Sequence, residues 1–216
     1  MLGSSRPRIL IADDHVLVAE ALKKFLVADF DVIGMVHDGR SLLLTAQPLA
    51  PDVIVADIGM PLLNGLDAAE RIKRFLPGVK FIFITITDAP DVIAEAFRRG
   101  ASGYLLKTST GAKLVAAIYD AIEGKPYLSP ELCSSVPGVL AQFESTGGWH
   151  DSLTERQREV LQLLAEGRSM KETAAVLNLT TRTVAFHKYR IMNTLHLRND
   201  ADIVRYAMQN HMLFAA

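Results

Sequence analysis

The side chain best suited to chemistry in the first half of the chain is the carboxylate of Asp57. It directly follows the apolar run Val53–Ala56, which has no polar alternation and is typical of a buried parallel strand. Pro61 and Gly65 then turn the chain. Open α/β sheets hold ligands at the carboxyl ends of their strands, although Asp57 by itself could also cap a helix that begins near Asn64.

Four further side chains with suitable chemistry also follow short apolar runs. Asp13 and Asp14 come after the first run, Thr85 after the fourth and Lys107 after the fifth. Clustered carboxylates repel one another and raise each other's pKa, and a hard cation such as Mg²⁺ relieves this repulsion. Metal and lysine would neutralise a phosphoryl group while a carboxylate attacks phosphorus. Taken singly, the two acids could cap a helix, the lysine could lie on the surface and the threonine could be an ordinary strand residue. The position of all five residues at strand ends favours a single phosphoryl-binding site.

The elements that would position these side chains alternate between strand and helix over residues 7–124. This alternation predicts an α/β fold with a doubly wound, parallel, five-stranded sheet, for which 2-1-3-4-5 is a flavodoxin-like strand order. The strands are expected at Arg8–Ala12, Asp31–Val36, Val53–Ala56, Lys80–Ile84 and Gly103–Leu106. The helices are expected at Val16–Ala28, Ser41–Gln47, Asn64–Phe75, Pro90–Arg99 and Ser109–Glu123.

Residues 8–124 resemble the receiver domain of two-component response regulators, through the motifs ILIADDH, VADIGMPLLNG, FIFIT and GYLLK in the family's order and spacing. The resemblance implies that Asp57 accepts a phosphoryl group from a sensor histidine kinase. It also implies a site for Mg²⁺ (or Mn²⁺) at Asp13, Asp14, Asp57 and Gly59.

The same resemblance implies a switch next to the phosphoryl site. Lys107 would pair with the phosphoryl group, and Thr85 would hydrogen-bond to it when the switch closes. Tyr104 matches the family's switch aromatic, and a half-buried strand tyrosine is the alternative. A phosphoryl group adds about −1.5 to −2 charges and three acceptor oxygens. We therefore expect phosphorylation to change the conformation of the face formed by Pro90–Glu123.

Residues 125–149 are expected to form a linker, because Pro126, Pro130 and Pro137 interrupt them. A short helix is possible at Val139–Phe143, and the side chains of Phe143 and Trp149 are expected to pack against a neighbouring domain.

Residues 150–216 have a helical pattern and no convincing strand. Two short helices, a tight turn and a longer helix form a helix-turn-helix signature. Helix caps are expected at Thr154, at Ser169 and at Thr180 or Thr181. The helices are expected to begin near Glu155, to cover Met170–Leu177, to run from Thr181 to about Leu195, and to cover Asp200–Gln209.

This part resembles the LuxR-type helix-turn-helix through LTERQREVLQLLAEG, NLTTRTV and FHKYRIMNTL. A receiver followed by this module is the architecture of NarL/FixJ-type response regulators. The resemblance implies sequence-specific binding of double-stranded DNA as a dimer, with Thr183–Tyr189 in the major groove and Asp200–Met208 at the dimer contact. The expected DNA-binding residues are Lys171, Thr180, Thr181, Arg182, Thr183, Ala185, Phe186, Lys188, Tyr189 and Arg190.

The recognition helix departs from the family at its base-facing positions. Ala185 stands where many members have lysine, and Phe186 and Tyr189 stand where small or basic residues are common. With fewer contacts to phosphates, the chain should bind DNA more weakly and with a smaller dependence on salt concentration. The apolar side chains could instead contact the methyl groups of thymine. His187 matches the family histidine and is expected to pack rather than to bind a metal.

Composition agrees with a protein of the cytoplasm. The net charge is −1, and the single cysteine, Cys133, excludes an intramolecular disulfide and fits a reducing compartment. No apolar run approaches the roughly 18 residues of a membrane helix, and no leader pattern opens the sequence. Residues 150–216 hold 9 basic and 7 acidic residues, a mild positive excess that permits binding to nucleic acid.

The leading hypothesis is therefore a transcription regulator in which phosphorylation of Asp57 controls dimerisation and promoter binding. An alternative, motivated by Ala185, Phe186 and Tyr189, is an output that binds proteins or a small effector with weak or no DNA binding. An aspartate-based phosphatase would need a second acid two residues after Asp57, where Gly59 stands. We therefore expect no enzyme, only self-phosphorylation and slow self-dephosphorylation.

Overall fold

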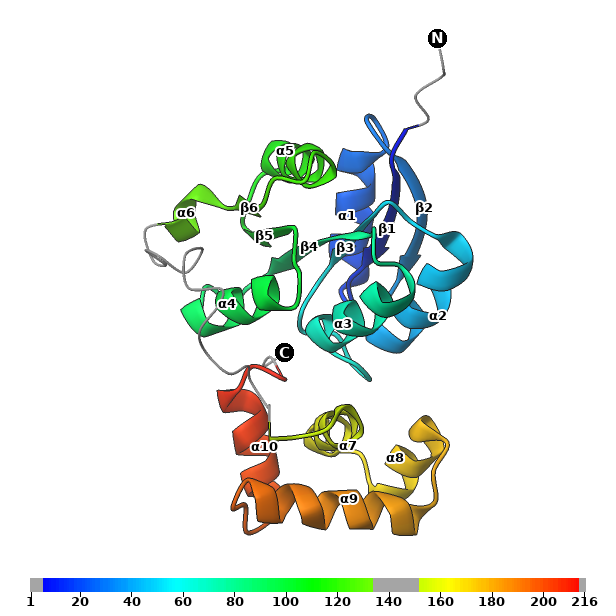
Figure 1. Cartoon of the computed structure of the whole chain (residues 1–216), viewed down its shortest axis with the longest axis vertical. Helices are drawn as coiled ribbons and strands as arrows, with labels where there is room; N and C mark the ends of the chain where they lie inside the picture. Colours follow the sequence, from blue (N-terminus) through cyan, green and yellow to red (C-terminus); the bar gives the residue numbers. More distant parts are fainter. Residues whose placement is uncertain (1–5, 134–151, 214–216) are drawn as a thin grey trace. The chain divides into compact units, whose positions relative to one another are not determined.

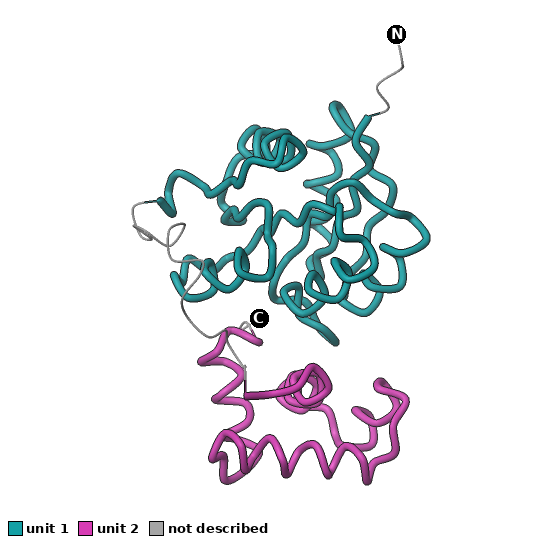
Figure 2. Tube along the Cα trace, in the orientation of Figure 1, with its two compact units in different colours: residues 1–146 teal, residues 147–216 magenta. Residues whose placement is uncertain are grey.

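The apolar runs of the first half pair into one parallel sheet with the strand order β2-β1-β3-β4-β5-β6 (Figure 1). The computed structural model describes residues 6–133 and 152–213, and the chain divides into two units, residues 1–146 and 147–216 (Figure 2). The order of the first five strands confirms the flavodoxin-like prediction. The strands are β1 (Arg8–Ala12), β2 (Asp31–Val36), β3 (Val53–Ala56), β4 (Lys80–Thr85), β5 (Gly103–Leu106) and β6 (Tyr127–Leu128).

The prediction of five strands was wrong by one, because β6 extends the sheet. Gly103 and Tyr104 of β5 are in register with Tyr127 and Leu128 of β6. The sequence did not predict β6 because prolines lie close to it on both sides, and because a two-residue edge strand is too short to show an alternating pattern. The first part of the expected linker, residues 125–133, thus belongs to the first unit, and its remainder, with Val139–Phe143 and Trp149, lies outside the described residues.

Helices cover both faces of the sheet, with α1 and α5 on one side and α2, α3 and α4 on the other (Figure 1). Helix α2 continues through Pro48, where the sequence predicted its end, because a proline in the last turn removes only one hydrogen bond. The helices are α1 (Val16–Leu26), α2 (Gly39–Leu49), α3 (Gly65–Phe75), α4 (Pro90–Arg98), α5 (Gly111–Ile122) and α6 (Pro130–Cys133).

A hydrophobic core lies between the sheet and helices α1 and α5. Alternate residues of the strands, such as Ile9, Val55 and Ile82, point into it and meet Leu26 and Ile118. The strands are apolar throughout because helices cover both faces of the sheet, α1 and α5 on one face and α2 and α3 on the other.

The second unit is helical in its described residues. Each helix begins at a residue whose side chain accepts a backbone N–H, namely Thr154, Ser169, Thr180 and Asn199. Thr180 rather than Thr181 is therefore the cap of the third helix. The helices are α7 (Glu155–Ala165), α8 (Met170–Leu177), α9 (Thr181–Thr194) and α10 (Asp200–Gln209). In the described parts of both units, none of the helices combines the length and the apolar character needed to cross a membrane.

Candidate functional site

Asp57 lies at the carboxyl end of β3 with 7% of its surface exposed. Its backbone N–H donates to the carbonyl of Ala12 at 2.8 Å, which places it beside the end of β1. The N–H of Gly59 donates to Asp57 Oδ1 at 3.3 Å. Asp57 is not a helix cap, because Asn64 caps α3 by accepting the N–H of Asp67 at 2.8 Å.

Lys107 joins the two buried carboxylates at this edge of the sheet. Its Nζ lies 2.7 Å from Asp57 Oδ2 and 2.9 Å from Asp13 Oδ2. Burial alone would lower the pKa of Lys107, but hydrogen bonds and charge from Asp57 and Asp13 outweigh it and raise that pKa. The lysine is thus held as a cation within reach of any group bound at Asp57.

A divalent cation fits the same edge of the sheet. Ligand atoms of Asp13, Asp14, His15 and Asp57 all lie within 4.8 Å of one another. Oδ2 of Asp13 is buried and accepts no hydrogen bond from the described residues, although Lys107 is near. A buried carboxylate oxygen among other carboxylates is a suitable ligand for a hard cation.

His15 is a member of this cluster that the sequence reasoning missed. Its Nδ1 lies 2.8 Å from Asp14 Oδ1, and its backbone N–H donates to Asp13 Oδ1 at 2.9 Å. The signal was its position directly after the two acids, but the ring is exposed and an adjacent histidine alone does not indicate a ligand.

Thr85 and Tyr104 are both fully buried beside the site. The carbonyl of Thr85 accepts the N–H of Lys107 at 2.8 Å, and its hydroxyl accepts the N–H of Thr87 at 3.5 Å. The hydroxyl of Tyr104 donates to the carbonyl of Thr87 at 3.0 Å. Burial, with nearby carboxylates led by Asp57, raises the pKa of Tyr104, so the phenol stays neutral. Tyr104 thus contacts the β4–α4 loop and is more buried than a half-buried strand tyrosine.

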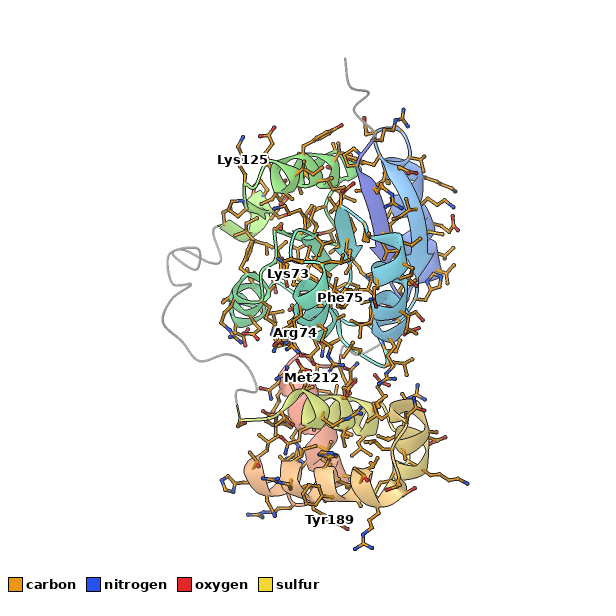
Figure 3. All side chains as sticks on the ribbon, turned by 45° about the vertical axis from the view of Figure 1, so that its right-hand side comes forward. Lys73, Arg74, Phe75, Lys125, Tyr189 and Met212 are labelled. Carbon is orange, nitrogen blue, oxygen red and sulfur yellow. The ribbon has the colours of Figure 1, made fainter. Side chains whose placement is uncertain are left out.

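An ionic cluster that the sequence did not predict connects α3 to the end of α4. The guanidinium of Arg99 lies 2.5 Å from Asp67 Oδ1 and also pairs with Glu95 and with Glu70 at 3.2 Å. Both Asp67 and Glu95 are almost completely buried. Lys73 of α3, marked in Figure 3, adds a hydrogen bond to the carbonyl of Gly100.

In the second unit, α9 packs against α7 and α8 through Val184 and Ile191, which are fully buried. Leu195, the residue that follows α9, is half-buried. On the outer side Phe186 is 56% exposed and Tyr189 is 61% exposed, and Figure 3 shows Tyr189 on this side of α9. The predicted outward direction of these two rings is therefore confirmed.

The remaining polar residues of α9 divide into exposed and buried ones. Arg182 and Arg190 are exposed, but the side chain of Lys188 is only 13% exposed and its Nζ lies 2.5 Å from Asp200 Oδ1. His187 is half-buried, and burial followed by the charges of Arg156 and Arg190 lowers its pKa. A neutral, packed imidazole agrees with the expected structural role of His187.

Comparison with known proteins accounts for both units. Residues 9–119 match the response regulator receiver domain, and residues 151–207 match the bacterial regulatory proteins of the luxR family. The chain is 36% identical over 208 residues to the transcriptional regulatory protein LiaR of Bacillus subtilis, covering 95% of this chain and 99% of LiaR. It is 30% identical over 214 residues to the oxygen regulatory protein NreC of Staphylococcus carnosus, covering 95% and 99%.

Solved structures agree with this assignment. The RcsB response regulator of Salmonella typhimurium superposes with a TM-score of 0.58 at 25% identity, covering 95% of this chain and 99% of that one. A structure described as an RcsB–DNA complex gives a TM-score of 0.57 at 26% identity, covering 94% and 98%. The chain therefore belongs to the NarL/FixJ-type response regulators, transcription regulators that join a receiver domain to a LuxR-type helix-turn-helix domain.

Proposed function

We propose that Asp57 accepts a phosphoryl group from a sensor histidine kinase and that this modification controls DNA binding by α9. The observation that carries the proposal is the position of Lys107 Nζ, 2.7 Å from Asp57 and 2.9 Å from Asp13. Such an arrangement supplies a nucleophilic carboxylate and a fixed cation within one water-poor edge of the sheet.

The transfer needs little from the protein besides position and charge. A carboxylate oxygen of Asp57 forms a bond to phosphorus while the bond from phosphorus to the kinase histidine breaks. Asp13, Asp14 and Asp57, together with Gly59, would hold Mg²⁺ or Mn²⁺, which supplies charge neutralisation when bound. Lys107 keeps its proton because the carboxylates raise its pKa, so it stays available to the phosphoryl oxygens.

The new charge would act on the residues that already contact the site. Phosphorylation redirects Lys107 and offers acceptor oxygens to the buried hydroxyl of Thr85. A shift of Thr85 is transmitted to Thr87, whose N–H and carbonyl bond to Thr85 and Tyr104 respectively. The face Pro90–Glu123 is the surface that this shift would change, as a bistable element biased by a local charge.

The output would be recognition of double-stranded DNA by a homodimer. The N-terminal half of α9 enters the major groove, and α10 provides a dimer contact over Asp200–Met208. This function requires the compartment that holds both DNA and the kinase, the cytoplasm. The residues proposed to face DNA are Lys171, Thr180, Thr181, Arg182, Thr183, Ala185, Phe186, Lys188, Tyr189 and Arg190.

A second output, binding of a protein or a small effector, is favoured by one observation. The exposed rings of Phe186 and Tyr189 form an apolar surface that also suits a protein partner. Failure of the full-length chain to enrich any fragment from genomic DNA would favour this output over DNA recognition.

Phosphorylation of the purified chain by a small phosphoryl donor such as phosphoramidate, with Mg²⁺, tests the first step. Intact-mass analysis should show one added phosphoryl group, which chelation of the metal and Asp57→Asn should each abolish. Asp29→Asn, a change at an exposed carboxylate of the same unit, serves as the matched control and should be modified normally. Modification that survives Asp57→Asn would contradict the assignment.

A further inference from the structure

The outer face of α9 combines aromatic rings with a helix that contains no acid. Phe186 and Tyr189 are three residues apart and therefore neighbours on that face, and half-buried Ala185 lies beside them. We refer to Ala185, Phe186 and Tyr189 as the α9 strip. Both rings are more than half exposed.

The charges around the α9 strip favour DNA as its occupant. The basic residues of α9 are Arg182, Lys188 and Arg190, and the guanidinium carbon of Arg190 lies 5.6 Å from the centroid of the Phe186 ring. This cation–π contact holds a positive charge next to the apolar ring. A basic helix edge beside an apolar strip complements a groove that is lined by phosphates.

The chemistry of the α9 strip restricts what it can read. The Phe186 ring and the Ala185 methyl group offer no hydrogen bond, so a polar base edge placed against them would lose water without gaining a partner. The apolar group that the major groove presents is the C5-methyl group of thymine, and 5-methylcytosine presents the same methyl group. The α9 strip would therefore favour bases that carry a C5-methyl group and disfavour unmethylated cytosine.

We propose that the α9 strip selects DNA sites by contacting C5-methyl groups of pyrimidines, a proposal that rests on the DNA-binding function above. Lys188 contributes little to this selection, because its ammonium is paired with Asp200 and its side chain is mostly buried. Specificity would thus come from apolar contact, whereas Arg182 and Arg190 supply affinity through phosphates.

The test starts with selection of sites from a random duplex library by the full-length protein in Mg²⁺ and beryllofluoride. The selected site is then resynthesised with deoxyuridine in place of single thymidines, which removes only the methyl group. We expect affinity to fall about fourfold for each methyl that faces the α9 strip. Copies carrying 5-methylcytosine instead of cytosine show whether a methylated G·C pair is accepted at the same positions.

Matched variants assign the effect to the ring. Phe186→Ala should remove the discrimination between thymidine and deoxyuridine, whereas the distant exposed change Leu44→Ala should keep it. Circular dichroism checks that each variant folds. Equal binding of thymidine and deoxyuridine sites by the unmodified protein would overturn this inference and leave DNA binding intact. Selection of no site at all would overturn the proposed function as well.

Discussion

Nζ of Lys107 lies 2.7 Å from Oδ2 of Asp57, and this ion pair links the ends of β5 and β3. The same ammonium lies 2.9 Å from Asp13 at the end of β1, so one cation serves the ends of three strands. The ammonium of Lys107 can therefore move toward a phosphoryl group on Asp57. A metal ion bound at the carboxylates would then neutralise the negative charge that the lysine no longer balances.

Replacement of Lys107 should make stability depend on Mg²⁺. In Lys107→Met two nearly buried carboxylates face each other without the ammonium, which we expect to lower the free energy of unfolding by about 2–3 kcal/mol in the presence of chelator. Mg²⁺ binds the folded state and should recover most of this loss. Urea unfolding with and without Mg²⁺ measures both values.

Lys24→Met, a change at an exposed lysine of α1, is the control and should alter the free energy of unfolding by well under about 1 kcal/mol. If Mg²⁺ stabilises neither variant, the carboxylates of Asp13 and Asp57 do not form the metal site. Equal stabilisation of the two variants would contradict the predicted recovery of Lys107→Met by the metal ion.

Arg99 should be among the most sensitive charged residues of the first unit. Arg99→Leu leaves the buried carboxylates of Asp67 and Glu95 without their shared partner, which should cost about 3–5 kcal/mol of unfolding free energy. Arg74→Leu, which removes an exposed pair with Glu70, should cost less than about 1 kcal/mol. Similar urea midpoints for the two variants would show that the cluster does not stabilise the contact between α3 and α4.

The same cluster predicts part of the acid sensitivity. Burial alone would raise the pKa of Glu95, but hydrogen bonds and charge from Arg98 and Arg99 outweigh it and lower that pKa below its ordinary value. Its contribution to stability is thus present above the pKa of an unfolded glutamate, about 4.3, and is lost as the pH falls through its lower folded pKa.

Glu95→Gln removes this dependence. The variant should be less stable than the unmodified chain at pH 7, and the difference between the two urea midpoints should narrow as the pH is lowered toward 3. A difference that stays constant over that range would mean that Glu95 does not titrate below its ordinary range in the folded protein.

Tyr104→Phe should distinguish a role of Tyr104 in stability from a role in the response of DNA binding to phosphorylation. Loss of the hydroxyl leaves the carbonyl of Thr87 without this hydrogen bond and should reduce the free energy of unfolding by about 1 kcal/mol. Phosphorylation of Asp57 by phosphoramidate should continue, but the change in DNA affinity on phosphorylation should shrink. Tyr119→Phe, at an exposed ring, controls for loss of a phenol; an unchanged DNA response in Tyr104→Phe would assign Tyr104 to packing.

Lys188 and Arg190 should differ in their effect on the salt dependence of DNA binding. Arg190→Met should reduce the slope of log affinity against log salt by about 0.9, the value for one phosphate contact. Lys188→Met should reduce the slope by less than Arg190→Met, because Asp200 competes with the DNA phosphates for this ammonium. A loss of slope in Lys188→Met equal to that in Arg190→Met would show that Lys188 leaves Asp200 to contact DNA.

The positions of the chemical side chains could be predicted because parallel strands end together. Apolar runs located the strands, and Asp13, Asp57 and Lys107 followed from the rule that their carboxyl ends share one edge. The caps at Thr154 and Ser169 were likewise local, since each depends on a residue three positions later.

The features that the sequence did not reveal depend on contacts between distant residues. The Arg99–Asp67 pair joins α3 to the residue that follows α4, and its charges look like ordinary helix surface in the sequence. The burial of Lys188 has the same origin, because its partner Asp200 belongs to α10. Strand β6 was missed because two residues between prolines carry no period.

The most direct test of the account is the DNA affinity of the full-length protein in Mg²⁺, with and without beryllofluoride, on a site obtained by selection. We predict an affinity about tenfold higher with beryllofluoride, within the usual range of coupling between two sites, and no difference in Asp57→Asn. Equal affinity in both states would contradict control by Asp57, and the absence of specific binding in either state would contradict DNA recognition by α9.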